Sequence, residues 1–308
     1  MGMASYNPFM GQTIKTNGKT PTDRVFLAHY QLTAAQAVAA DDDYLKADAL
    51  TTLAVQNFAG PYLNEILAPR VLSITADTAN MAGNVVITGT DANDEALTNN
   101  IALNGAAAVN GTRAFKTVTN IQYPAARLQS GSATVTTAAD TQSGNVTATV
   151  TAAVIGGAQT TGNIAVLDSD TKADIATKIA AAIDADATIG ADFDCVADGE
   201  DIVLTAKVPA ANDATYDLTV ADTGLTGVVV GAYADVVTGI PAGNIRVGIS
   251  DLFGIPYKLP YSTVMAMYAN GVADVVAASA WSETVLAGNY IDPTIALAGA
   301  QVDVYLVV

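Results

Sequence analysis

Apolar and polar residues alternate most clearly between residues 70 and 128. Apolar residues take every second position in RVLSITAD, GNVVITGTD, EALTNNIALNG and TRAFKTVTNIQYP. A period of two puts successive side chains on opposite faces of a strand, so the pattern predicts four β-strands that follow one another as a β-meander. The DANDE segment at 91–95 predicts a hairpin loop, because Asp and Asn side chains bond their own backbone and tolerate positive φ.

The pattern changes between residues 129 and 240, where Thr, Ala, Gly and Val dominate. One segment there has a helical period: three isoleucines recur every fourth residue, preceded by a T-x-x-D capping box from Thr171 to Asp174. The three isoleucines are Ile175, Ile179 and Ile183. Strands are predicted at DFDCVAD, DIVLTAKV and YDLTVAD. Together these features indicate a compact α+β unit with one helix packed on a small sheet.

The two ends of the chain have different patterns. Residues 1–24 are punctuated by Gly and Pro and predict an extended arm. Residues 25–60 mix a strand-like start with alanine-rich stretches that are compatible with helix. Alternation returns after residue 240, and the chain finishes in AQVDVYLVV. An end as apolar as this one predicts docking, either as a central strand or in a subunit interface.

These patterns predict a mainly β fold built from three parts. Residues 1–24 form the N-terminal arm, residues 25–128 and 241–308 form one discontinuous antiparallel β-sandwich or barrel-like domain, and residues 129–240 form an inserted small α+β domain. Folded domains tolerate an inserted domain best at the tip of an exposed loop.

Composition supports β-structure and limits the partners. The chain of 308 residues is 51% hydrophobic but only 6% aromatic, because its apolar content is mostly Ala and Val, which suits thin β-layers. Its 30 acidic and 13 basic residues give a net charge of −17, which repels nucleic acid, so no direct nucleic-acid partner is predicted. The start has no secretory-signal order, and Asn270, Gly271 and Asp274 interrupt the most apolar window, so no membrane partner is predicted.

Residues for catalysis are scarce. His29 is the single histidine, which excludes a histidine pair or a multi-histidine zinc site within one chain, and no GxSxG elbow accompanies it. We interpret His29 as a partly buried or interface residue. Cys195, the single cysteine, has acidic neighbours that raise a thiol pKa and is interpreted as a small core residue. The glycine-rich stretch at 227–244 lacks the Gly-Lys-Ser/Thr ending of a phosphate-binding loop.

Acidic clusters are the stronger candidates for a site. The clusters are Asp41 to Asp43, the DANDE segment at 91–95, and Asp168 with Asp170. Their oxygens suit calcium, but none has the twelve-residue loop that closes on a glutamate, so solvated turns and helix caps are the simpler interpretation. We therefore predict no catalytic, cofactor-binding or metal-binding residues and no enzyme.

Aromatic residues give little sign of a sugar-binding cleft. Trp281 is the single tryptophan, and such clefts usually stack sugars on several aromatic rings. Tyr257, Tyr261 and Tyr268 lie close in sequence and suit either a small adhesive patch or core packing. These exclusions leave a structural, non-enzymatic role as the prediction.

Several stretches resemble a family of virion structural proteins of tailed bacteriophages and prophages, encoded among the head genes. The resemblance lies in VVITGTDANDEALTNNIALNG with AVNGTRAFKTVTNI, in NIRVGISDLFGIPYKLPY, and in the closing VDVYLVV. The segment at 168–220 resembles a small module that recurs in phage structural proteins. Together these stretches cover most of residues 70–308.

The resemblance implies a capsid decoration, cement or head-fibre-like protein on the lattice of the major capsid protein. It implies a location on the capsid surface after synthesis in the bacterial cytoplasm, with copies of the same chain as further partners, a trimer being one such assembly. A tail or head-to-tail component, such as a tube, adaptor or fibre protein, is the alternative. A secreted adhesin or carbohydrate-binding module is disfavoured by the missing signal and the scarce aromatics.

Overall fold

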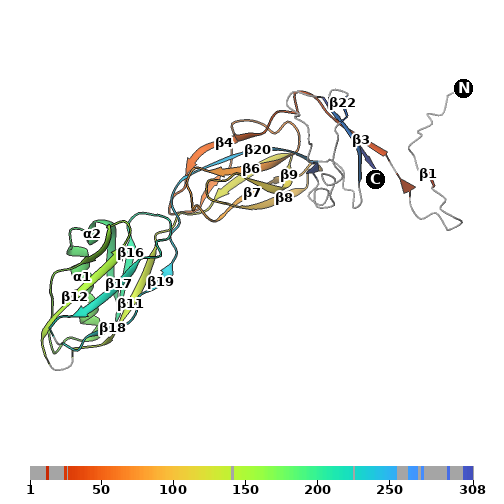
Figure 1. The fold of residues 1–308 in the computed structure, drawn as a ribbon. Coiled ribbons are helices and arrows are strands. Elements are labelled where there is room, and N and C mark those ends of the chain that lie inside the picture. The colour runs from red at the N-terminus through yellow and green to blue at the C-terminus, as the bar shows by residue number, and fades with distance from the viewer. Residues whose placement is uncertain are drawn as a thin grey trace, which may run out of the picture.

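The structure of the protein is a computed structural model that describes residues 12–13, 24–25, 27–139, 142–224, 226–254, 263–269, 272–273, 290–291 and 301–307. The fold is mainly β, with 51% strand and 8% helix, which confirms the predicted fold class. Two units with separate hydrophobic cores and one further sheet lie in line along the molecule (Figure 1). No described helix has the length and apolar character needed to cross a membrane.

The first unit, called the sandwich, packs two antiparallel sheets face to face. Sheet 1 has the order β23–β20–β6–β9, with β4 also paired to β20, and sheet 2 has the order β5–β10–β7–β8. The strands of sheet 1 are β4 (Asp41–Leu50), β6 (Arg70–Ala76), β9 (Val109–Phe115), β20 (Asn244–Gly254) and β23 (Tyr290–Ile291). The strands of sheet 2 are β5 (Gln56–Phe58), β7 (Asn84–Thr90), β8 (Ala96–Ala102) and β10 (Thr117–Tyr123).

The core of the sandwich follows the alternation of the sequence. Leu72 and Ile74 of β6 face Val85 and Ile87 of β7, and all four are fully buried. Opposed apolar faces about 10 Å apart are the usual arrangement when two sheets pack. Every second residue therefore points into one core shared by both sheets.

The predicted β-meander is wrong in its connections. Three of the expected strands are β6, β7 and β8, but TRAFKTVTNIQYP divides at Lys116 into β9 of sheet 1 and β10 of sheet 2. Strand β6 pairs with β9 and β20 rather than with β7. Alternation identifies strands and their inward faces, but it does not identify partners, because a strand can turn its apolar face inward from either sheet.

The predicted hairpin loop between β7 and β8 is confirmed. Asp91 Oδ1 accepts the backbone N–H groups of Asn93 at 2.8 Å and Glu95 at 3.0 Å. Asp94 has φ of 64°, in the left-handed region that Asp and Asn tolerate best among residues with a Cβ. The loop thus satisfies its own backbone donors.

The second unit, called the module, contains two sheets and two helices. Sheet 3 contains β11 (Ser130–Thr137), β15 (Phe193–Asp198), β16 (Asp201–Ala206), β18 (Val229–Val230) and β19 (Ala234–Val237). Sheet 4 contains β12 (Gly144–Ala152), β13 (Gly157–Thr160), β14 (Ile164–Val166) and β17 (Asp217–Asp222). The helices are α1 (Lys172–Ala185) and α2 (Ile189–Asp192). The predicted strands are β15, β16 and β17, but they belong to two sheets instead of one.

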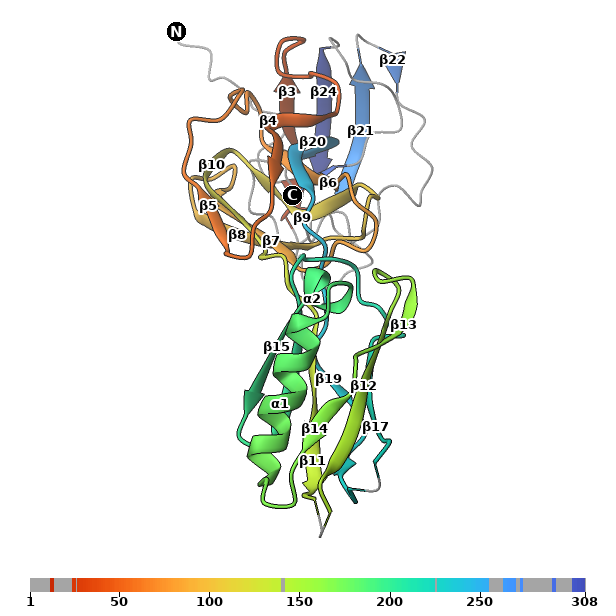
Figure 2. The same ribbon diagram turned by 90° about the vertical axis from the view of Figure 1, so that its left-hand side faces the viewer.

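Helix α1 confirms the helical prediction. Its three isoleucines are fully buried in the module core, against the inner face of β15, β16 and β11 (Figure 2). The capping box is complete: Thr171 Oγ1 accepts the N–H of Asp174 at 3.2 Å, and Asp174 Oδ2 accepts the N–H of Thr171 at 3.0 Å. The two side chains thus accept backbone N–H groups that have no partner within the helix at its first turn.

No helix forms in the described residues 27–60, so the suggestion of helix in the alanine-rich stretch is wrong. These residues form β3 (Leu27–Leu32), then β4 and β5. Strand β4 pairs with β20 from Asp41 to Leu50. Alanine favours helix only weakly, and pairing with a neighbouring strand overrides that preference.

The last strand of the chain belongs to a further sheet outside the two units, called the end sheet. Its order is β22–β21–β24–β3, with β21 (Thr263–Ala269), β22 (Val272–Ala273) and β24 (Val302–Val307). Strand β24 lies between β21 and β3, which confirms that the apolar end is docked as a central strand. In the predicted arm, β1 (Gln12–Thr13) pairs with β2 (Arg24–Val25), and its other residues lie outside the described part.

Two chain segments join the sandwich to the module. Arg127 and Ile240 exchange a reciprocal pair of backbone hydrogen bonds, each 3.0 Å long, at this joint. Both views show the module at one end of the sandwich and the end sheet at the other (Figures 1 and 2). The boundaries predicted at residues 128 and 240 stay predictions.

Candidate functional site

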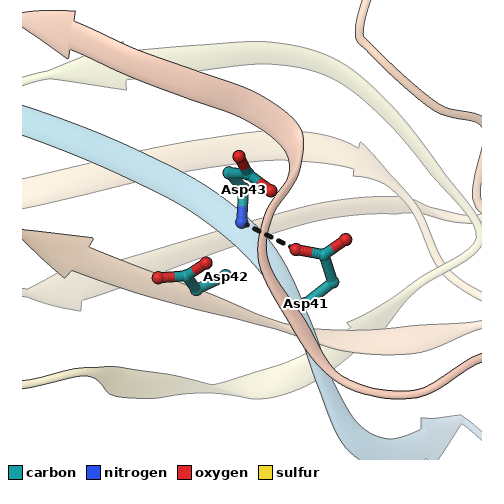
Figure 3. Close-up of side chains that lie close together, drawn as sticks. All are labelled: Asp41, Asp42 and Asp43. Atoms are coloured by element: carbon teal, nitrogen blue, oxygen red, sulfur yellow. Dashed lines mark hydrogen bonds between the residues drawn. The ribbon is translucent and has the colours of Figure 1, made fainter.

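The first candidate is the acidic start of β4, where Asp41, Asp42 and Asp43 are all exposed (Figure 3). One carboxylate oxygen of each lies within 4.8 Å of the others. The backbone N–H of Asp43 donates to Asp41 Oδ1 at 3.3 Å. A hydrogen bond with Asp41 and the negative charges of both neighbours raise the pKa of Asp43. The three residues lie in a strand instead of the turn that we expected.

Asp41 and Asp42 also line a groove of about 680 Å³ on the outer face of sheet 1. Its other polar lining residues are Ser73, Thr75, Asn110, Ser250 and Asp251. Carboxylate, hydroxyl and amide oxygens are the ligands that calcium prefers. These residues therefore have the chemistry to hold a hard cation.

Arg246 of β20 already neutralises part of this acidic region. Its guanidinium contacts Asp42 at 2.9 Å and Asp48 at 3.2 Å. The side chains of Asp42 and Asp48 are 51 and 57% exposed, and that of Arg246 is 32% exposed. Ion pairs this open to water contribute little free energy. The network is therefore a solvated ion-pair surface on β4 and β20.

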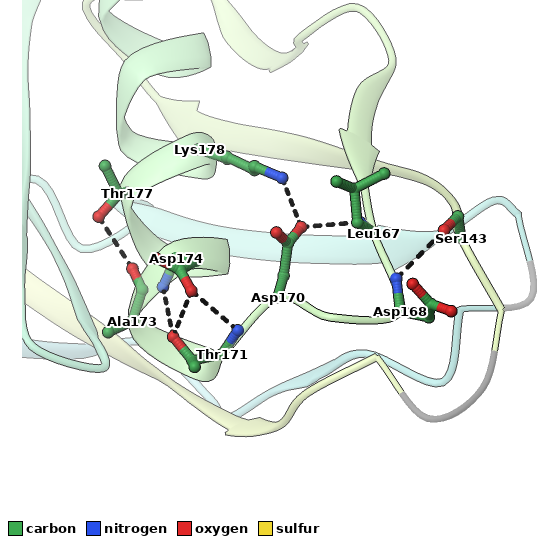
Figure 4. A network of polar contacts seen from close by, with 9 residues as sticks. All are labelled: Ser143, Leu167, Asp168, Asp170, Thr171, Ala173, Asp174, Thr177 and Lys178. Carbon is green, nitrogen blue, oxygen red and sulfur yellow. Dashed lines mark hydrogen bonds and ion pairs between the residues drawn. The ribbon is translucent and has the colours of Figure 1, made fainter.

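The other acidic clusters do not converge on a common point. Asp170 Oδ2 pairs with Lys178 and accepts the N–H of Leu167 at 2.7 Å (Figure 4). Burial raises the pKa of Asp170, but the hydrogen bonds from Lys178 and Leu167 outweigh it and the net pKa is lowered. The Asp168 carboxylate points away from this contact, and its N–H donates to Ser143 Oγ at 3.1 Å. A turn and a helix start account for this cluster, as the sequence predicts.

Arg70 is the most buried charged residue of the described part, with 2% of its side chain exposed. Its Nε donates to the carbonyl of Ser250 and its Nη2 to the carbonyl of Val38, both at 2.9 Å. The guanidinium lies 3.9 Å from the centre of the Phe253 ring. Burial lowers the pKa of Arg70 to about 10. Arg70 thus ties β6 to β20 and to the segment before β4, and nothing in the sequence separates it from an ordinary strand start.

The single cysteine is a core residue, as predicted. Cys195 is free and 3% exposed on the inner face of β15. Burial, together with the charge of Asp184, raises the pKa of its thiol to about 12. A thiol in this state is a poor nucleophile at neutral pH.

The remaining aromatic and histidine candidates are only partly described. His29 lies opposite Tyr305 in the pairing of β3 with β24, and its side chain is outside the described part. Trp281, Tyr257 and Tyr261 also lie outside the described residues. Tyr268 belongs to β21, and its side chain is not described. No described contact joins these residues in an adhesive patch.

A second pocket, of about 320 Å³, lies at the end of the module next to the joint. Its lining is mostly apolar: Ala152, Ala153, Val154, Phe193, Ala206, Val208, Ala210, Ala211 and the ring of Tyr216. The Gln129 side chain closes one side by bonding the backbone of Asp213 in both directions, at 2.7 and 2.9 Å. Sequence periodicity did not predict this pocket, because segments far apart in the chain, between Gln129 and Tyr216, form it.

Charge is distributed unevenly between the units. Residues 129–240 contain 15 acidic and 3 basic residues, a net charge of −12. The rest of the chain contains 15 acidic and 10 basic residues, a net charge of −5. Most of the negative charge therefore lies on the module. Comparison of the chain with protein-family models, curated proteins and solved structures finds no match.

Proposed function

We propose that this protein is a non-enzymatic structural component of a tailed-phage virion, a capsid decoration or cement protein bound to the lattice of the major capsid protein. The observation that carries the proposal is the in-line arrangement of the units, with the module at one end of the sandwich and the sheet of β3, β21, β22 and β24 at the other (Figure 1). Such a molecule can attach by one end and present the other.

The joint suits this role because both connecting segments leave the same end of the sandwich. Residues 124–129 run out to the module and residues 238–243 return beside them, held by the bonds between Arg127 and Ile240. The sandwich keeps its own core, so its packing does not depend on the module's contacts. We infer that the sandwich and the end sheet form the base on the shell and that the module projects outward.

The charge distribution supports the same orientation. A projecting unit of net charge −12 repels its neighbours on a crowded particle and keeps the particle surface hydrated. The rest of the chain, the predicted arm included, contains 10 of the 13 basic residues and has a net charge of only −5, so the attached end meets less charge repulsion between neighbouring copies. The resemblance of the sequence to phage head proteins agrees with this location. Copies of the same chain are the second proposed partner, as a homo-oligomer on the shell.

Cryo-electron microscopy of purified particles that contain the protein tests the proposal. We expect density for the sandwich on the shell lattice, with density for the module at a larger radius. Density along the tail or at the head-to-tail junction would instead support the alternative of a tube, adaptor or fibre component. Particles without any density for this chain would contradict both.

A binding experiment tests the orientation separately. Shells that lack the protein are mixed with the full chain, with a variant in which a short linker replaces residues 129–240, and with residues 129–240 alone. We expect the full chain and the linker variant to sediment with the shells and the isolated module to stay in the supernatant. Binding by the module alone would reverse the proposed orientation.

A further inference from the structure

Exposed aliphatic side chains lie on the sandwich side of the joint. Leu50 ends β4, Leu53 and Val55 follow it, and the three side chains are 56, 57 and 53% exposed. Their segment is fixed to both connections: the N–H of Thr51 donates to the carbonyl of Gly243 at 3.0 Å, and the N–H of Ala126 donates to the carbonyl of Thr52 at 2.8 Å. Residues 50–55 therefore form an apolar edge at the start of the joint.

The apolar pocket lies on the module side of the same joint. Gln129, which lines it, follows Ala126 by three residues, a span of about 11 Å at most in an extended chain. Two valines of its lining, Val154 and Val208, are 64 and 66% exposed. Two exposed apolar surfaces are thus held within a short reach by the connecting segments.

We propose that the module closes onto the sandwich by bending at residues 127–128 and 240–242, between Gly243, which is bonded to the sandwich, and Gln129 and Gly239, which are bonded to the module, so that Leu53 and Val55 enter the apolar pocket. Burial of these side chains against Val154, Val208 and the pocket alanines removes apolar surface from water on both sides. Residues 50–60 contain no charged residue, so closure places no charge beside Asp192 and Asp213 at the pocket. The joint gives the module two positions, an extended one and a closed one.

A disulfide between the two surfaces tests closure. In the variant Leu53→Cys with Val208→Cys, a bond forms only if the two Cα atoms approach to within about 7 Å. The native thiol of Cys195 is buried and does not compete. Under mild oxidation we expect an intramolecular bond, identified by peptide mass, to form on the order of tenfold faster than in the control Leu53→Cys with Val196→Cys. Val196 is 57% exposed on the outer face of β15, away from the pocket.

Equal rates in the two variants would overturn the proposal, and so would bonds formed only between chains, which would assign the pocket to a second copy.

A second variant tests closure without cysteine chemistry. Leu53→Asp should favour the extended position and increase the radius of gyration in small-angle X-ray scattering. Leu63→Asp is the matched control, because Leu63 is 60% exposed on the same sandwich beside Leu45. An unchanged radius in Leu53→Asp would also overturn the proposal.

Discussion

Most aspartates of the described loops act as acceptors for nearby backbone N–H groups. Asp222 is the clearest case, because its carboxylate accepts the N–H groups of Gly224, Thr226 and Gly227 at 3.1, 3.0 and 2.7 Å. Asp91 and Asp174 do the same in a hairpin loop and at a helix start. A carboxylate in such a position stabilises the local turn and needs no metal or substrate to explain it.

The capping box gives the first prediction. Replacing Thr171 by Ala removes the acceptor for the Asp174 N–H and should lower the free energy of unfolding by about 1 kcal/mol. Thermal and urea unfolding measure the change. Thr177→Ala is the control, because Thr177 lies exposed within α1 and its hydroxyl only donates to the Ala173 carbonyl. Equal losses in both variants would mean that the box does not stabilise the helix.

Cys195 gives the second prediction. Its burial and raised pKa should leave the native thiol unlabelled by a thiol-specific disulfide reagent at pH 8, whereas the denatured protein should react completely. A variant that combines Cys195→Ala with Val196→Cys moves the thiol to an exposed position and should react at once. Fast labelling of native Cys195 would show that the module core opens readily.

The Asp222 carboxylate gives a prediction of pH dependence. Burial raises its pKa, but the three backbone N–H groups outweigh burial and the net pKa lies below the ordinary value of 3.8. A lowered pKa in the folded state gives stability that is present above the unfolded value and is lost as the pH falls through the folded value. The melting temperature should therefore fall steeply below about pH 4, and this fall should be smaller in Asp222→Asn. Asp198→Asn, at the exposed end of β15, should give a curve parallel to that of the wild type.

At the scale of elements, the two sheets of the sandwich are joined by side chains as well as by apolar contact. Tyr123 of β10 is fully buried, and its hydroxyl donates to the carbonyl of Ile245 in β20 at 3.0 Å. Its ring meets Phe58 edge to face, with centroids 4.9 Å apart. Arg70 of β6 has a comparable role within sheet 1, where its Nε donates to the carbonyl of Ser250 in β20. Each contact fixes how one strand lies against another, which alternation alone leaves open.

The hydrogen bond from the Tyr123 hydroxyl to the Ile245 carbonyl, which joins the two sheets, gives the fourth prediction. Tyr123→Phe keeps the ring but leaves the Ile245 carbonyl buried without this donor, so it should lower the free energy of unfolding by about 1–3 kcal/mol. Urea unfolding measures the loss. Tyr44→Phe, whose hydroxyl donates to the Glu65 carbonyl near solvent, should lose less. The reverse order of losses would contradict a role for Tyr123 in joining the sheets.

At the scale of the whole molecule, the fold divides into units with separate cores. The module core and the sandwich core have no residue in common among the described residues. The joint between them is narrow, since Arg127 and Ile240 are hydrogen-bonded across it. This arrangement explains how a chain of net charge −17 can concentrate charge on one unit without disturbing the packing of the other.

A deletion tests whether the units fold independently. Replacing residues 129–240 by a linker of a few Gly and Ser residues should leave a folded β-protein, because Arg127 and Ile240 already lie side by side. Residues 129–240 alone should also unfold cooperatively. Circular dichroism and thermal unfolding measure both fragments. A linker variant that stays in solution only as an unfolded chain would contradict the predicted boundaries.

The sequence by itself determined the strands with clear alternation, helix α1 and the faces that they bury. The isoleucines of α1, the capping box, the DANDE loop and the core position of Cys195 all follow from local periodicity and local hydrogen bonding, which need no distant partner. Tertiary structure alone decided that β6 pairs with β20, that β9 and β10 enter different sheets, and that Arg70 is buried. It also decided where the groove beside Asp41 and the apolar pocket of the module lie. The physical reason is that pairing, burial of a charge and the shape of a pocket depend on contacts between residues far apart in the chain, which hydrophobic alternation does not encode.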